Sequence, residues 1–128
     1  MADLFLDTNV LIDYLRGYAP AIRFLAERQH ADRFLCSVVT AFELHKGCRD
    51  AGEQARLDRV LRSFTIVPIE PDDSLRGLEW FRQWRLSHGV GMLDCLIGAA
   101  ARRLGAPFFT RDEDHFSLFP DLDLRAPY

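Results

Sequence analysis

The sequence predicts an α/β protein with three layers, in which helices cover both faces of a central, mainly parallel sheet of four to five strands. Short apolar segments alternate along the chain with longer segments of helical periodicity. The apolar segments lack polar alternation, which is typical of parallel strands buried on both faces. Strands that alternate with helices build parallel sheets through helical crossovers. Together these observations predict the α/β/α architecture.

Composition indicates an ordinary globular protein. The chain has 128 residues, of which 48% are hydrophobic and 27% charged, so we expect one domain spanning residues 1–128. No apolar run approaches the roughly 20 residues of a membrane span, and the N-terminus does not resemble a secretory leader. The three cysteines include no Cys-x-x-Cys pair, which favours reduced thiols. We therefore expect a cytoplasmic protein.

Capping residues justify each element in the first half of the chain. Gly17 ends the first helix, and Pro20 opens the second, since a proline at the first helical position removes no hydrogen bond. Ser37 is a suitable N-cap, and Gly47 lies at the end of the helix that follows. The predicted elements are a strand at 3–7, helices at 10–16 and 20–30, a strand at 34–36 and a helix at 38–47.

Capping residues also mark the ends of the helices in the second half of the chain. Asp72 or Asp73 can cap a long helix, Gly89 and Gly91 form a loop, and Gly105 ends the next helix. Trp80, Phe81 and Trp84 on the long helix fit core packing or a protein interface better than base stacking. The predicted elements are a helix at 54–63, a strand at 65–69, helices at 72–88 and 92–104, a strand at 107–110 and a short edge strand around 122–124.

Four acidic residues are predicted to meet at one edge of the sheet. Asp7 follows the first strand, and Asp112 follows the fourth. Glu43 lies on a helix face turned to the sheet, and Asp94 lies in the first turn of its helix. Taken alone, Asp7, Asp94 and Asp112 have plainer explanations as turn formers or a dipole-stabilised surface residue, whereas Glu43 on that face needs a partner. Because ligands bind beyond the carboxyl ends of parallel strands, the four together indicate a site.

Converging carboxylates favour a bound cation. Two of them about 4 Å apart repel by roughly 4 kcal/mol at an effective dielectric near 20, so the group must take up protons or bind a cation. The ligands are hard oxygens, which favour Mg²⁺ or Mn²⁺ over Zn²⁺. A carboxylate-held Mg²⁺ pairs with phosphate and assists phosphodiester hydrolysis. The net charge of −3 does not decide against a nucleic acid, because a bound metal reverses the local sign.

The residues around these acids resemble a known family. Asp7-Thr8-Asn9-Val10-Leu11-Ile12 is similar to the opening motif of PIN-domain nucleases, and three further motifs follow in the family's order over nearly the whole chain. The size of the chain is most like that of the VapC toxins of bacterial toxin–antitoxin pairs. The further motifs are Ser37 through Thr40, Glu43 and Leu44 to Gly47, then Asp94-x-x-Ile97-x-Ala99-Ala100-Ala101, then Thr110-Arg111-Asp112 through Phe116.

The resemblance implies a Mg²⁺-dependent endoribonuclease, in which Mn²⁺ may substitute, that inhibits translation by cutting structured RNA such as tRNA or rRNA. It also implies a homodimer that a VapB-type antitoxin holds inactive, with operator DNA bound only through the antitoxin. Its catalytic and metal-binding positions are Asp7, Glu43, Asp94 and Asp112, supported by Thr8, Asn9 and Thr110.

The fourth motif departs from the family pattern. The family often has Asn at the position of Asp112 and Asp at that of His115. Asp114 is therefore the reserve metal ligand. The third motif also lacks its usual preceding proline, since Met92-Leu93 stands there.

A rival interpretation is a protein with the same fold but little or no nuclease activity. A weakly catalytic or non-catalytic PIN domain could serve as the partner in a DNA-binding regulatory complex with an antitoxin. An acid phosphatase-like hydrolase is disfavoured, because no Asp-x-Asp pair ends the first strand. Growth arrest that depends on Asp94 would separate the ribonuclease from the regulator.

Overall fold

The computed structural model describes residues 1–128 and contains one five-stranded sheet in the order β3-β2-β1-β4-β5. Every neighbouring pair of strands is parallel. The strands are β1 (Asp3–Leu6), β2 (Arg33–Ser37), β3 (Phe64–Val67), β4 (Phe108–Phe109) and β5 (Leu124–Arg125), and the helices are α1 (Thr8–Leu15), α2 (Ala19–Arg28), α3 (Val38–Lys46), α4 (Ala51–Leu61), α5 (Pro71–His88), α6 (Met92–Leu104) and α7 (Glu113–Phe116). The predicted α/β/α fold with a parallel sheet is confirmed.

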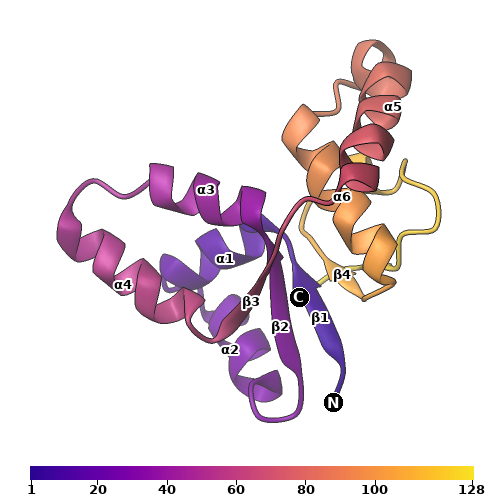
Figure 1. Ribbon diagram of the computed structural model, residues 1–128. Helices are drawn as coiled ribbons and strands as arrows, with labels where there is room; N and C mark the ends of the chain where they lie inside the picture. Colours follow the sequence, from indigo (N-terminus) through magenta and orange to yellow (C-terminus); the bar gives the residue numbers. More distant parts are fainter.

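One face of the sheet packs against α1, α2 and α4, which lie together on one side of the strands (Figure 1). Leu4 and Leu6 of β1 point into this layer because successive strand residues face opposite sides. They pack with buried residues that include Leu11, Phe24 and Leu61. The sheet is therefore buried on this face by the N-terminal half of the chain.

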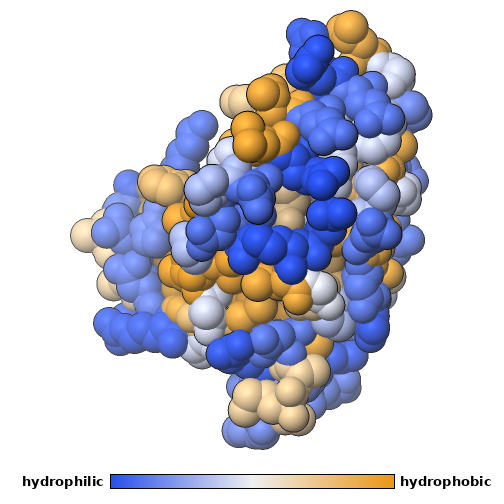
Figure 2. Space-filling model, turned by 45° about the vertical axis from the view of Figure 1, so that its right-hand side comes forward, coloured by the Kyte–Doolittle hydropathy of each residue, from blue (hydrophilic) through white to orange (hydrophobic).

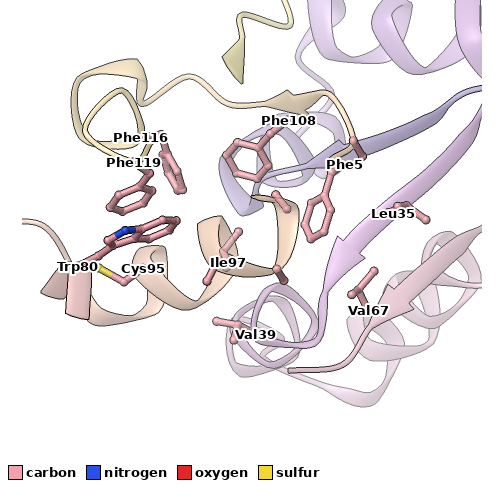
Figure 3. Close-up of a cluster of buried hydrophobic side chains, with 14 of the residues drawn as sticks. Phe5, Leu35, Val39, Val67, Trp80, Cys95, Ile97, Phe108, Phe116 and Phe119 are labelled. Carbon is pink, nitrogen blue, oxygen red and sulfur yellow. The ribbon is translucent and has the colours of Figure 1, made fainter. Parts of the chain in front are cut away.

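The opposite face packs against α5, α6 and α7. Phe5 and Phe108 lie at the sheet, Ile97 of α6 lies beside them, and Trp80 of α5 lies farther out (Figure 3). The rings of Trp80 and Phe119 stack with centroids 4.4 Å apart and planes 8° apart. The prediction that Trp80 packs in the core is thus confirmed, and this second core holds α5 and α6 against the strands.

Several boundaries differ from the sequence predictions. The first helix begins at Thr8, because Asp7 already caps it. The fourth begins at Ala51, since the Asp50 carboxylate accepts a hydrogen bond from the Glu53 amide at 2.8 Å. α7 was expected to be an acidic turn, and it forms one helical turn that Asp112 caps.

The surface carries both charged and apolar residues. Figure 2 shows hydrophobic residues gathered in patches among hydrophilic ones on one face. Leu75 and Leu78 of α5 fit the apolar periodicity of the helix, yet they are 68% and 55% exposed. Phe42 of α3 is 72% exposed. None of the helices combines the length and the apolar character that crossing a membrane requires.

Gly98 of α6 tests the packing of the second core. A Cβ atom at this position would lie 2.6 Å from Cδ2 of Phe119, whose ring cannot withdraw because it stacks on Trp80. We expect Gly98→Ala to lower the free energy of unfolding by about 1–3 kcal/mol, as overpacking does, despite the better helix propensity of alanine. Urea denaturation followed by circular dichroism measures the change.

Gly47 provides the matched control. A Cβ atom at this position would lie 3.5 Å from its nearest neighbour, the Leu44 carbonyl oxygen, which is an ordinary van der Waals distance. Gly47→Ala should change stability by less than about 0.5 kcal/mol. Equal stability of the two alanine variants would show that Phe119 does not press on α6.

Candidate active site

Asp7 lies between β1 and α1, and its side chain is only 4% exposed. Its own N–H donates to the Phe109 carbonyl of β4 at 2.9 Å, which fixes the backbone. One carboxylate oxygen accepts from the Thr8 amide at 2.8 Å, and the other accepts from the Thr110 hydroxyl at 2.7 Å. The buried carboxylate is therefore held in one orientation by both neighbouring segments.

Glu43 reaches the same region from α3, which begins directly after β2. Its Oε1 accepts a hydrogen bond from the Thr8 hydroxyl at 2.8 Å. The Thr8 oxygen also lies 2.8 Å from the hydroxyl of the buried Thr40. Because an ionised Glu43 can only accept, Thr8 donates to Glu43 and accepts from Thr40. Residues of α1 and α3 thereby hold Glu43 next to the segment that carries Asp7.

Asp94 and Asp112 face each other across the carboxyl edge of the sheet. Asp94 lies in the first turn of α6, and Asp112 caps α7. One ligand atom from each of Asp94, Asp112 and His115 lies within 4.8 Å of the others. His115 contacts Asp112 directly, with Nδ1 at 3.0 Å from Oδ2. These three side chains form the more exposed side of the site.

Thr110 connects the two sides. Its hydroxyl donates to Asp7 and accepts from the Asp112 amide at 2.9 Å and from the Asn9 side-chain amide at 3.3 Å. The Asn9 carbonyl oxygen in turn accepts from the Arg111 amide at 3.3 Å. Thr110 is fully buried, so this junction is shielded from water and fixes the end of β4 against the start of α1.

Burial and neighbouring negative charges raise the pKa values of Asp7 and Asp94. Burial raises the pKa of Asp7 to about 7, the negative charges of Asp94 and Glu43 add to the rise, and the hydrogen bonds from Thr110 and Thr8 oppose it. Burial likewise raises the pKa of Asp94 to about 6, with contributions from Asp112 and Glu43. A cation placed among these carboxylates would offset the cost of burial and the repulsion between them, and would favour their ionised forms.

The donor set fits a hard divalent cation. Asp94 and Asp112 offer ligand atoms within 4.8 Å of each other, and the charges of Asp94 and Glu43 act on the nearby Asp7. Oxygen donors of this kind suit Mg²⁺ and Mn²⁺. Asp7 and Glu43 are oriented by hydroxyl donors, as ligating carboxylates commonly are. Their arrangement can hold a cation against a phosphate group at the open side of the cluster.

Of the remaining predicted residues, three lie within the cluster and one lies outside it. Thr8, Asn9 and Thr110 all hydrogen-bond within the cluster. Asp114 is exposed, and its carboxylate lies outside the group formed by Asp94, Asp112 and His115. Asp112 rather than Asp114 is thus the acid of this turn that faces the site.

Two residues at the site, Thr40 and His115, were not predicted to have a functional role. Thr40 is fully buried beside Thr8, and its position three residues before Glu43 was a usable signal, because residues three apart share a helix face. His115 was treated only as a departure from the family pattern. Its contact with Asp112 follows from the helical turn of α7, which the sequence did not predict.

Comparison with known proteins assigns the chain to a family. The PIN-domain family model matches residues 4–122. Ribonuclease VapC19 of Mycobacterium tuberculosis is 33% identical over 125 residues, which cover 96% of this chain and 98% of the relative. The chain therefore belongs to the PIN-domain family and, within it, to the VapC ribonucleases.

Solved structures agree at the level of the fold. The toxin–antitoxin complex from Klebsiella pneumoniae contains a chain with a TM-score of 0.81 at 24% identity, with 98% of each chain covered. DNA-bound VapBC from Salmonella typhimurium contains one with a TM-score of 0.82 at 18% identity, with 100% of each chain covered.

Asp94→Asn tests whether the acids repel one another. The pKa of Asp94 in the folded protein, about 6, lies above its ordinary 3.8, so the folded state keeps a proton that the unfolded state has lost. Asp94 should therefore lower stability by about 1 kcal/mol as the pH rises from about 5 to 8, and Asp7, with a pKa of about 7, should lower it further over the same range. With a chelator present, we expect Asp94→Asn to flatten this decline and to raise the thermal midpoint at about pH 8.

Asp114→Asn is the matched control, since it neutralises an exposed acid outside the cluster. It should retain the wild-type pH dependence, measured by thermal unfolding at several pH values. Addition of Mg²⁺ should stabilise the wild type more than Asp94→Asn. A pH dependence that is the same in all three proteins would contradict the convergence of charge at Asp94.

Proposed function

We propose that residues 1–128 form one PIN domain that acts in the cytoplasm as a Mg²⁺-dependent endoribonuclease, the toxin of a type II toxin–antitoxin pair. The observation that carries this proposal is the convergence of Asp7, Glu43 and Asp94 beside Asp112, with raised pKa values at Asp7 and Asp94. The relative VapC19 is named a ribonuclease. The free cysteines are consistent with a reducing compartment.

In this proposal Asp7 and Asp94 are the direct ligands of Mg²⁺, for which Mn²⁺ can substitute. Asp112 completes the site, and Glu43 holds a second cation or orients the attacking water. A bound divalent cation supplies Lewis-acid stabilisation of the charge that develops on the phosphoryl oxygens. In-line attack by water would leave a 5′-phosphate and a 3′-hydroxyl. The substrate class is structured RNA, such as tRNA or rRNA.

The hydrogen bonds around the acids support different proposed roles for them. Both oxygens of Asp7 already accept hydrogen bonds, one from an amide and one from a hydroxyl, so Asp7 is fixed as a ligand. Glu43 accepts through Oε1 from Thr8, which leaves Oε2 to accept a hydrogen bond from a water molecule. Thr8 therefore positions the carboxylate that would orient the nucleophile.

An antitoxin of the VapB type is the proposed protein partner. A groove of about 470 Å³ lies between α1, α3 and α4, and Glu43 lines one end of it. Ile12, Leu15, Leu44 and Leu57 supply its apolar lining. An apolar segment of the antitoxin lying in this groove could extend to the acidic site and block it. The complex from Klebsiella pneumoniae, a toxin–antitoxin assembly by its title, supports the pairing.

We also propose that the protein is a homodimer. Phe42 of α3 and Leu75 and Leu78 of α5 are large apolar side chains left exposed in the single chain. Burial of such residues is the usual driving force for association. Operator DNA would be bound only through the antitoxin.

Cleavage of RNA tests the catalytic part of the proposal. Purified protein incubated with structured RNAs and Mg²⁺ or Mn²⁺ should cut them, and a chelator should abolish the cutting. Asp94→Asn should lower the rate by about 100-fold or more, since loss of a metal ligand removes several kcal/mol of transition-state stabilisation. Asp114→Asn should retain the wild-type rate. Undiminished cleavage by Asp94→Asn would refute the assigned site.

The rival function is a non-catalytic partner in a DNA-binding complex, and the DNA-bound VapBC of Salmonella typhimurium makes it worth testing. Expression of the toxin alone should arrest growth, and Asp94→Asn should relieve the arrest while antitoxin binding persists. A regulator without catalysis would tolerate the loss of Asp94. Arrest that is equal in wild type and Asp94→Asn would therefore favour the rival.

A further inference from the structure

We propose that His115 is a direct ligand of the divalent cation, so that the site has a nitrogen donor and prefers Mn²⁺ over Mg²⁺ more strongly than an all-carboxylate site would. This inference rests on the proposed metal-dependent function and deepens it. The family often has Asp at this position, whereas this chain has His115.

The main chain holds His115 at the site. It lies in the single turn of α7, where the Asp112 cap accepts a hydrogen bond from the His115 amide at 3.4 Å. The next residue, Phe116, is fully buried, and its ring centroid lies 4.8 Å from that of Phe108. Packing of Phe116 therefore fixes the turn, and the imidazole is carried on a well-anchored backbone.

The distances around the ring suit coordination. His115 Nδ1 lies 3.0 Å from Asp112 Oδ2. Adjacent ligands of an octahedral ion with bonds of about 2.1 Å are separated by about 3.0 Å. Ligand atoms of Asp94, Asp112 and His115 all lie within 4.8 Å of one another. Small rotations of the three side chains therefore suffice for them to share one cation.

The second ring nitrogen is already engaged in the manner of a ligating histidine. Nε2 lies 3.2 Å from the main-chain carbonyl oxygen of His88 at the end of α5. A carbonyl can only accept, so Nε2 carries the hydrogen and donates it. Metal-bound histidines commonly donate their other N–H to a backbone carbonyl, which fixes the ring and its tautomer. Nδ1 faces Asp112 Oδ2, which also accepts, so Nδ1 carries a proton in this structure and a cation that binds Nδ1 must displace that proton.

A nitrogen donor changes which ion the site prefers. Mg²⁺ binds almost exclusively to oxygen ligands, whereas imidazole is a good ligand for first-row transition ions. Replacing an acid of the family pattern by His115 also removes one negative charge from the donor set. Affinity for Mg²⁺ should fall more than affinity for Mn²⁺.

Pulsed electron paramagnetic resonance of bound Mn²⁺ tests the coordination directly. The wild-type protein should show the ¹⁴N coupling of a coordinated imidazole, and His115→Asp, which restores the acid of the family pattern, should bind Mn²⁺ without it. His30→Gln is the matched control, since His30 is exposed on another part of the chain, and it should retain the coupling. Calorimetric titration should show that His115→Asp lowers the ratio of Mn²⁺ to Mg²⁺ affinity by about tenfold.

The outcomes separate this inference from the function on which it rests. Mn²⁺ bound to the wild type without imidazole ¹⁴N coupling, or an unchanged affinity ratio in His115→Asp, would overturn the role of His115 and leave the carboxylate site standing. Absence of Mn²⁺ binding to the wild type, with no RNA cleavage, would overturn both.

Discussion

The buried carboxylate of Asp7 is the group around which the site is built. It lies at the end of β1, the central strand of the sheet, where burial of a charge is costly unless hydrogen bonds or a cation compensate. β1 pairs in parallel with β2 on one side and β4 on the other. Both neighbours therefore end at the same edge and deliver polar side chains to it: Thr40 and Glu43 through α3, and Thr110 directly from the end of β4.

Two hydrophobic cores make this arrangement possible. Leu4 and Leu6 pack against one helical layer, and Phe5 packs against the other. The sheet is rigid enough for a cluster of acids to persist at its edge, although the acids repel one another. Burial first, and the neighbouring acids second, raise the pKa values of Asp7 and Asp94. The same crowded negative charges destabilise the metal-free fold and attract a cation. Neutralising one acid should therefore weaken cation binding and raise the stability of the metal-free protein.

The sequence predicted this architecture because topology follows from local signals. Apolar strands that alternate with helices predict a parallel sheet, and a parallel sheet brings the residues after each strand to one edge. Asp7 and Asp112 could therefore be paired although they lie far apart in the chain. Glu43 was found because an acid on a helix face turned to the sheet requires a partner.

Other features depend on contacts that no local pattern encodes. α7 is only four residues long, too short for a periodic signal, and the partner of the His115 ring is a carbonyl 27 residues earlier. Leu75 and Leu78 fit the apolar stripe of α5 but remain exposed, because periodicity cannot distinguish a face packed within the chain from one left for a partner. The C-terminal Tyr128 donates to Asp13 of α1 at 2.6 Å, a contact across nearly the whole sequence.

Net charge alone is a poor guide to the partner of this protein. The formal charge of −3 would repel a phosphate backbone if it were spread evenly, yet much of the acidity near the sheet edge is concentrated in one cluster. A divalent cation held there reverses the local sign, so the negative cluster becomes the position where a phosphate can approach. Arg111, which lies between Thr110 and Asp112, is already paired with Asp13 at 2.7 Å. In the proposed function, attraction for the scissile phosphate would therefore come from the cation rather than from this arginine.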